Sequence, residues 1–253
     1  MNTHNNSVAD GVRQASFELT IADESVGAAI WMPKQIHRPL PLLLVAHGGG
    51  QHKLFAPLAG HASLLARQLQ CAVVAIDAPG HGGRSQSADM RELTEILQRQ
   101  VRAGDGPSEA VLDHMLQNAA QAADEWRLVL DHLHARDDVD EHGAVGFIGM
   151  SMGAMTGILL AAREPRVSAA IFGLAGARDP ARRLEVAARE IRIPLQFVLQ
   201  WDDEWVRRED GLSLFDAFAS TEKTLHANPG GHATLPPHER AGWSAFFGRH
   251  LMT

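Results

Sequence analysis

Short runs of apolar residues recur along the chain, and segments with the spacing of amphipathic helices separate them. A continuous apolar run such as residues 42–46 is typical of a strand that is buried on both faces of a parallel sheet. Strands that alternate with helices predict a mostly parallel sheet with helices on both faces. The predicted strands are residues 42–46, 71–76, 144–148, 167–172, 195–200 and 224–227, and the predicted helices are residues 54–69, 88–101, 108–134, 154–162, 179–189, 211–219 and 236–251.

The beginning of the chain follows a different pattern. Residues 14–21 and 26–32 alternate or run apolar on either side of a short polar segment, which predicts an antiparallel hairpin. Residues 1–12 are largely polar and predict a flexible tail. The remaining residues, 13–253, contain no repeat and no linker, so we expect one domain.

Composition and charge narrow the classes of partner. The 253 residues carry a formal net charge of −7 at pH 7 without any basic block, which argues against nucleic acid or an anionic membrane as the main partner. No apolar run reaches the length of a membrane span, and the polar N-terminus lacks the layout of a signal peptide, so we expect a cytoplasmic protein. Cys71 is the only cysteine, so the chain cannot form an internal disulfide. We expect a monomer or a homodimer.

A serine between two glycines is the clearest chemical signal in the sequence. The segment Gly149-Met-Ser-Met-Gly153 follows one predicted strand and precedes a predicted helix. A serine at such a turn is pushed into solvent in a strained conformation, and the flanking glycines avoid collisions of a Cβ with neighbouring backbone. Ser151 is therefore the candidate nucleophile.

A serine hydroxyl needs a base, and the base needs an acceptor for its second nitrogen. His232 follows the last predicted strand in a glycine loop, at the edge of the sheet where working residues collect, and we expect it to be the base. The strand over residues 195–200 ends in a loop with three consecutive acids. We choose Asp203 as the orienting acid because the chain can turn back towards the core at Val206, and Asp202 stays open as the alternative.

Backbone N–H groups are the usual donors to an oxyanion. Met152, directly after the candidate nucleophile, would supply one. Gly49, in the His-Gly-Gly-Gly segment after the predicted strand over residues 42–46, would supply the other, with Gly50 as its alternative. No nucleotide-binding glycine motif accompanies this segment.

The order Ser151, Asp203, His232, together with the upstream His47-Gly-Gly-Gly50, resembles the α/β-hydrolase superfamily over nearly the whole chain. The segment Asp77-Ala-Pro-Gly-His-Gly-Gly-Arg-Ser85 is similar to a loop common in that superfamily. The serine turn resembles that of small bacterial esterases related to dienelactone hydrolase and to the S9 peptidase-like branch. The resemblance implies an α/β-hydrolase fold with a mostly parallel eight-stranded sheet, helices on both faces, and acyl-enzyme chemistry without a cofactor.

The substrate pocket is predicted from apolar residues on or next to these loops. Only residues 173–193 separate two predicted strands where many relatives carry a lid, which excludes a large cap there. The helices within residues 88–134 are expected to border the mouth instead. The candidate pocket residues are Met150, Trp201, Trp205, Leu54 and Phe55.

These observations predict a serine hydrolase that cleaves a small-molecule carboxylic ester, thioester or lactone of modest size. No His-Glu-x-x-His pattern appears, and we expect no metal. A peptidase or amidase, an acyltransferase and a carbon–carbon hydrolase remain open alternatives, as does a binding protein that has kept the fold and lost turnover.

Overall fold

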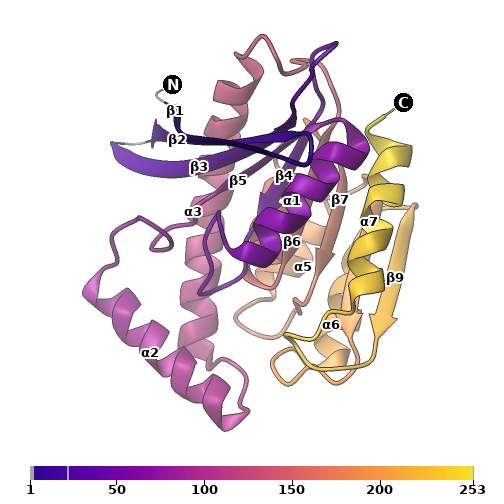
Figure 1. Ribbon diagram of the computed structural model, residues 1–253. Helices are drawn as coiled ribbons and strands as arrows, with labels where there is room; N and C mark the ends of the chain where they lie inside the picture. Colours follow the sequence, from indigo (N-terminus) through magenta and orange to yellow (C-terminus); the bar gives the residue numbers. More distant parts are fainter. Residues whose placement is uncertain (1–2, 22, 253) are drawn as a thin grey trace.

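A twisted nine-stranded sheet forms the centre of the computed structural model, which describes residues 3–21 and 23–252. Its strand order is β1-β2-β3-β5-β4-β6-β7-β8-β9 (Figure 1). Strands β1 to β3 pair in an antiparallel manner and β3 joins β5 antiparallel, whereas the strands from β5 to β9 are parallel. The strands are β1 (Thr3–Ala9), β2 (Val12–Ile21), β3 (Glu24–Pro33), β4 (Leu42–Ala46), β5 (Ala72–Ile76), β6 (Val145–Met150), β7 (Val167–Gly173), β8 (Leu195–Gln200) and β9 (Lys223–Asn228).

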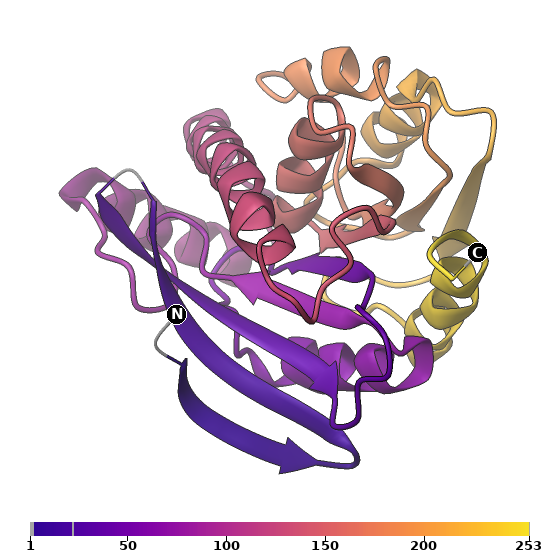
Figure 2. The same cartoon turned by 90° about the horizontal axis from the view of Figure 1, so that it is seen from above.

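Helices cover both faces of the sheet, as the alternating pattern predicts. Helices α1 and α7 lie together on one face, and α3 and α4 lie on the other (Figure 2). Each face has its own apolar cluster, centred on Trp243 and Phe246 on the first side and on Trp126 and Ile158 on the second. No helix in the described part of the chain has the length and apolarity to cross a membrane. The helices are α1 (Ala56–Leu69), α2 (Ala88–Ala103), α3 (Glu109–His134), α4 (Met152–Ala161), α5 (Arg183–Ala188), α6 (Arg208–Ala217) and α7 (Pro237–His250).

The register of the parallel strands brings the functional loops together. Ala46 at the end of β4 is paired with Gly149 of β6, and Met150 of β6 is paired with Gly173 at the end of β7. Gln200 and Asn228 likewise end β8 and β9 as a pair. The carboxyl ends therefore meet at one edge of the sheet, where ligands bind in open α/β sheets.

The N-terminal residues differ from the expected tail, and the sheet has nine strands where the resemblance implied eight. Residues 3–9 form β1, which pairs antiparallel with β2, while residues 1 and 2 lie outside the described residues. Asp10 and Gly11 connect the two strands and both have positive φ angles, of 49° and 77°, which is the geometry of a two-residue hairpin turn. An edge strand tolerates polar side chains, so the apolar pattern gave no sign of it.

The segment between β7 and β8 contains only the short helix α5, so the prediction that no large cap is inserted there is confirmed. Helix α2 instead lies beside one end of α3, away from the sheet (Figure 1). Its apolar side chains Leu93, Ile96 and Leu97 pack against the core cluster of the α3 face. Several residues of this helix, among them Met90 and Thr94, line a cavity that reaches Ser151 and His232.

Two helical glycines give a matched test of the packing of α4 on the sheet. A Cβ at Gly157 of α4 would collide with the ring of Phe147, whereas a Cβ at the exposed Gly60 of α1 would meet nothing within 4 Å. Gly157→Ala should lower the free energy of unfolding by about 1–3 kcal/mol through overpacking. Gly60→Ala should raise it by about 0.5–1 kcal/mol because alanine favours the helix. Urea titration of both variants checks this, and an unchanged midpoint for Gly157→Ala would contradict the packing described.

Candidate active site

Ser151 occupies a strained turn between β6 and α4. Its φ and ψ angles are 56° and −123°, a region that non-glycine residues adopt only when the surrounding structure enforces it. Its N–H donates to the carbonyl oxygen of Gly173 at 2.9 Å. A Cβ at Gly149 would collide with the carbonyl of Gly153, and a Cβ at Gly153 would lie 2.5 Å from the carbonyl oxygen of Ala46. The glycines at these two positions allow the turn to close against the end of β4.

His232 connects Ser151 to a buried carboxylate. The Ser151 hydroxyl donates to His232 Nε2 at 3.0 Å, and His232 Nδ1 donates to Asp203 Oδ2 at 2.8 Å. The side chain of Asp203 is only 1% exposed, and its other oxygen accepts the backbone N–H groups of Trp205 and Val206 at 2.8 and 2.9 Å. These bonds fix the carboxylate in the orientation that the imidazole requires. The structure thus brings together the three side chains that the sequence singled out.

All three consecutive carboxylates after β8 bind the histidine loop, each at a different atom. Asp202 accepts the N–H of Gly230 at 3.1 Å, and Glu204 accepts the N–H of His232 at 2.9 Å. Asp203 alone reaches the imidazole. The alternative acid from the sequence, Asp202, therefore contacts the backbone of the loop rather than the ring.

The indole of Trp205 lies flat against the imidazole of His232. The ring centroids are 4.4 Å apart and the planes differ by 25°. The backbone of Trp205 also donates to Asp203, so one residue supports both Asp203 and His232. Stacking of this kind restricts rotation of the imidazole without using either of its nitrogens.

The loop after β4 supplies the candidate oxyanion donors. Met152 is the first residue of α4, where the backbone N–H has no acceptor within the helix. The N–H of Gly48 is already bonded to Gln51 Oε1 at 3.1 Å, which leaves Gly49 and Gly50 as the glycines of this loop to consider. The choice of Gly49 stays a prediction.

His47 ties this loop to the loop after β5. Its Nδ1 donates to the carbonyl of Gly48 at 2.9 Å, and its Nε2 accepts the N–H of Ala78 at 3.0 Å. Burial lowers the pKa of His47 to about 4, so the ring is neutral at pH 7 and can act as donor and acceptor at once.

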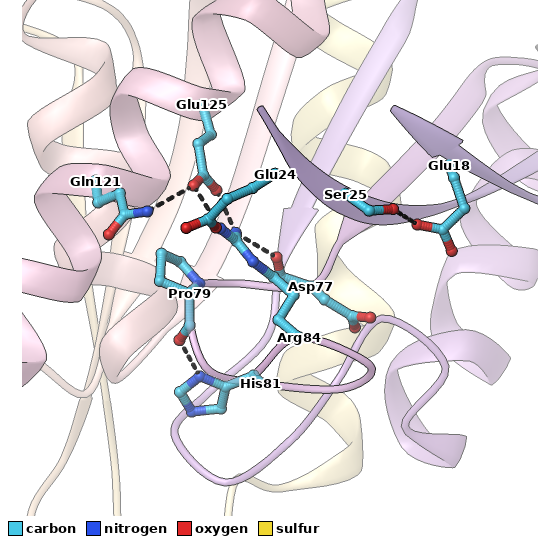
Figure 3. A network of polar contacts seen from close by, with 9 residues as sticks. All are labelled: Glu18, Glu24, Ser25, Asp77, Pro79, His81, Arg84, Gln121 and Glu125. Carbon is cyan, nitrogen blue, oxygen red and sulfur yellow. Dashed lines mark hydrogen bonds and ion pairs between the residues drawn. The ribbon is translucent and has the colours of Figure 1, made fainter. Parts of the chain in front are cut away.

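Buried ion pairs hold the loop after β5 in place (Figure 3). Asp77 accepts Lys53 Nζ at 2.6 Å, and the Lys53 ammonium, together with backbone N–H donors, lowers the pKa of this carboxyl despite its burial. Arg84, whose side chain is only 4% exposed, binds both oxygens of Glu125 on α3 and also pairs with Glu24 of β3. Lys53 therefore joins this loop to the loop after β4, and Arg84 joins it to α3 and β3. Both cations are paired with carboxylates and are not free to bind a ligand.

Two cavities of unequal size meet at Ser151 and His232. One has a volume of about 30 Å³ and is lined by Leu112, Met155 and Val206 among others. The other has a volume of about 1210 Å³ and reaches α2, which supplies several of its lining residues. We call this larger cavity the chamber. It is big enough for a small organic ligand.

The predicted pocket residues divide into two groups. Met150, Phe55 and Trp205 line the chamber. Trp201 does not line it; the residue is 43% exposed, and the guanidinium carbon of Arg208 lies 3.8 Å from the centroid of its ring. Leu54 does not line either cavity and packs against the apolar cluster of the α1 face.

Further histidines and polar residues line the chamber and were not identified from the sequence. His81 and His114 face it, as do Thr94 and Gln98 of α2. The only signal in the sequence was the polar face of the predicted amphipathic helix, which carries Thr94 and Gln98. Residues 3–21 and 23–252 contain no group of three or more His, Cys, Asp or Glu placed to hold a metal ion.

The part of the sequence that begins with β4 and includes α7 identifies the family of the protein. Residues 42–252 match the profile of the alpha/beta hydrolase family. The chain belongs to this family. No curated protein matches it significantly, so the solved structures give the remaining comparisons for this hydrolase.

Several solved structures resemble the hydrolase over nearly its full length. A cold-adapted esterase from an Arctic intertidal metagenomic library is 27% identical, covers 99% of this chain and 100% of its own, and has a TM-score of 0.78. Two more distant structures share the fold. The acetyl xylan esterase of Paenibacillus sp. R4 is 17% identical with a TM-score of 0.71 and coverage of 99% and 88%. The S-formylglutathione hydrolase of Agrobacterium tumefaciens is 16% identical with a TM-score of 0.69 and coverage of 99% and 100%.

His61 on the chamber wall makes the stability of the hydrolase sensitive to acid. Its Nε2 atom is buried without a hydrogen-bond partner among the described residues, and its ring packs edge-on against Trp243. Burial, with a smaller effect of the nearby Arg240, lowers its pKa to about 4 from an ordinary value of 6.5. The folded state therefore resists protonation that the unfolded state accepts, and this costs stability as pH falls from 6.5 towards 4.

We expect His61→Leu to reduce this dependence. Between pH 6.5 and 4 the native free energy of unfolding should fall by about 1.4 kcal/mol per pH unit for each such histidine, and the variant should lose one such contribution. Urea titrations at several pH values in that window measure the slope. His142→Gln is the matched control because the side chain of His142 is 87% exposed. Equal slopes for the native protein and His61→Leu would contradict the analysis.

Proposed function

We propose that the protein is a carboxylic ester hydrolase in which Ser151 is the nucleophile, His232 the base and Asp203 the orienting acid. The observation that carries this proposal is the unbroken chain of hydrogen bonds from Ser151 Oγ through both nitrogens of His232 to Asp203, at 3.0 and 2.8 Å. Such an arrangement is recognised by its geometry and roles rather than by position in the sequence. The likeness of the whole chain to an esterase at 27% identity supports the same reaction class.

The first half of the reaction forms an acyl-enzyme. His232 Nε2 takes the hydroxyl proton as Ser151 Oγ attacks the ester carbonyl, and Asp203 stabilises the resulting imidazolium. The negative charge on the carbonyl oxygen is held by the N–H groups of Met152 and Gly49. Collapse of this intermediate breaks the bond to the alcohol, which leaves with the proton from His232.

The second half repeats these steps with water. His232 removes a proton from a water molecule, which attacks the acyl carbon, and the acid is released as Ser151 regains its proton. Thioesters and lactones pass through the same intermediates, so the proposal includes them.

Alanine at the nucleophile or the base tests the triad. Ser151→Ala and His232→Ala should lower kcat for p-nitrophenyl acetate by a factor on the order of 10⁵–10⁶, since the three groups act as a unit. Asp203→Asn should cost about 10⁴-fold because an amide favours the wrong tautomer of the imidazole. Asp202→Asn is its matched control and should cost less than about tenfold. A greater loss in Asp202→Asn than in Asp203→Asn would overturn the assignment of the acid, and no turnover of any ester by the folded protein would overturn the proposal.

The unequal cavities indicate how the ester is divided between them. We assign the acyl group to the cavity of about 30 Å³, which has room for about two water-sized groups, and the alcohol to the chamber. Leu112, Met115 and Met155 are buried around the smaller cavity. Longer acyl chains would have to displace these side chains.

We therefore expect kcat/KM for p-nitrophenyl esters to fall at least about tenfold from butyrate to octanoate, since overpacking a close-packed wall costs about 1–3 kcal/mol. Met155→Ala should enlarge the cavity and raise the ratio of butyrate to acetate hydrolysis. Each variant serves as its own reference because the ratio is compared within one enzyme preparation. A preference for octanoate in the native protein would reverse the assignment of the two cavities.

A further inference from the structure

The chamber differs in charge from the protein that surrounds it. The whole chain carries 30 Asp and Glu against 23 Lys and Arg. Among the described residues that line the chamber there is no Asp and no Glu, but there are four arginines. They are Arg84, Arg91, Arg102 and Arg240. The chamber of this acidic protein therefore contains no negative side chain among the described residues that line it.

The four arginines are not equivalent. Arg84 is already neutralised by Glu125 and Glu24. Arg91 donates to the backbone carbonyl of Gln86 at 2.6 Å and has no carboxylate partner in the described part of the chain. Arg102 and Arg240 have no carboxylate partner either among residues 3–21 and 23–252. Three guanidinium groups can therefore bind an anion that enters the chamber.

The arginines lie on two walls. Arg91 and Arg102 are eleven positions apart in α2, which is close to three turns of an α-helix, so they share one face. Thr94 and Gln98 lie between them on that face and also line the chamber. Arg240 belongs to α7 on another wall, close to His61. A ligand in the chamber meets hydrogen-bond donors from both sides.

Most of the positive charge comes from the arginines rather than from the histidines. Burial lowers the pKa of His47 and of His61 to about 4, and it also lowers the pKa of His81. These rings are neutral at pH 7 and act as hydrogen-bonding groups. Guanidinium groups, by contrast, stay charged and bind carboxylate or phosphate through two parallel bonds.

We infer that the chamber binds an anionic group, a carboxylate or a phosphate, carried by the alcohol part of the ester. This inference rests on the proposed function, because it assigns the acyl group to the small cavity and the alcohol to the chamber. The substrate class is therefore a short-chain acyl ester of an anionic alcohol. A cavity lined by one sign of charge also concentrates ligands of the opposite sign.

The test compares two acetate esters that differ only in charge. The anionic substrate is 3-(4-acetoxyphenyl)propanoate, and the neutral one is the corresponding primary amide, which has the same phenol leaving group. We expect kcat/KM for the anion to exceed that for the amide at least about fivefold at low ionic strength. Because exposed charge pairs are screened by salt, the ratio should fall towards one in 0.5 M NaCl.

Arginine variants locate the effect. Arg240→Gln and Arg102→Gln should each lower the ratio of anion to amide, mainly through a higher KM for the anion. Arg99→Gln is the matched control, because Arg99 is exposed on the same helix as Arg102 and does not line the chamber, and it should leave the ratio unchanged. Methyl phosphate and acetate, as competitive inhibitors, show which of the two anions the chamber prefers, and inhibition by either one that is lost in Arg240→Gln supports the inference.

Two outcomes separate this inference from the proposed function. If both esters are hydrolysed at equal rates and the ratio does not respond to salt, the anion site is overturned while the esterase stands. If neither ester is hydrolysed by the folded protein, the proposed function fails and this inference fails with it. A loss in Arg99→Gln as large as that in Arg102→Gln would also overturn the site, since it would reflect the net charge of α2 and not contacts in the chamber.

Discussion

The position of His232 is the constraint on which the site depends. Its ring must meet Ser151 and Asp203 at once, although these residues are 81 and 29 positions away in the chain. The loop that carries it is rich in glycine and has little rigidity of its own. Its order comes from three consecutive carboxylates after β8, which bind two backbone N–H groups and the imidazole. The acidic segment therefore positions the proposed base in addition to providing its proposed acid.

The same edge of the sheet holds the other parts of the site with comparable precision. Ser151 is fixed because its N–H is bonded to the end of β7 and its flanking glycines pack against β4 and α4. His47 bonds the loop after β4 to the loop after β5. Each loop is thus tied to a neighbouring strand end, and the parallel register sets the distances between them. A slip of one residue in any of these strand pairs would separate the catalytic groups.

Sequence reasoning predicted the parts of the site that follow from local backbone requirements. The glycines around Ser151 are needed by any sharp strand-to-helix turn, so the serine could be identified without a structure. Asp203 was chosen over Asp202 on the expected direction of the loop, and the structure places Asp203 against the imidazole. Directions of side chains in irregular loops depend on distant neighbours, which explains why Trp201 and Leu54 do not line either of the two cavities.

The fold was likewise predictable where it depends on local sequence, and less so where it depends on contacts with distant parts of the chain. The buried strands were predicted within one or two residues because both of their faces must be apolar. Strand β1 was missed because its backbone pairing with β2 does not need apolar side chains, although Asp10-Gly11 is a typical hairpin sequence. The sequence did not indicate that Arg91 and Arg102 of α2 line a cavity, because a polar helix face usually points to solvent.

The arginines of the site illustrate two ways in which a protein accommodates positive charge. Arg84 is nearly fully buried, and removing Glu125, its buried partner, would leave the guanidinium with only the exposed Glu24, at a cost of about 3–5 kcal/mol. Arg91 and Arg102 of α2 are exposed, so water solvates them and they need no partner in the fold. For that reason they can exchange water for an anion at little cost to stability, whereas Arg84 cannot. Cations that stabilise the loops and cations that remain available to a ligand are therefore distinguished by burial, even though all of them line one cavity.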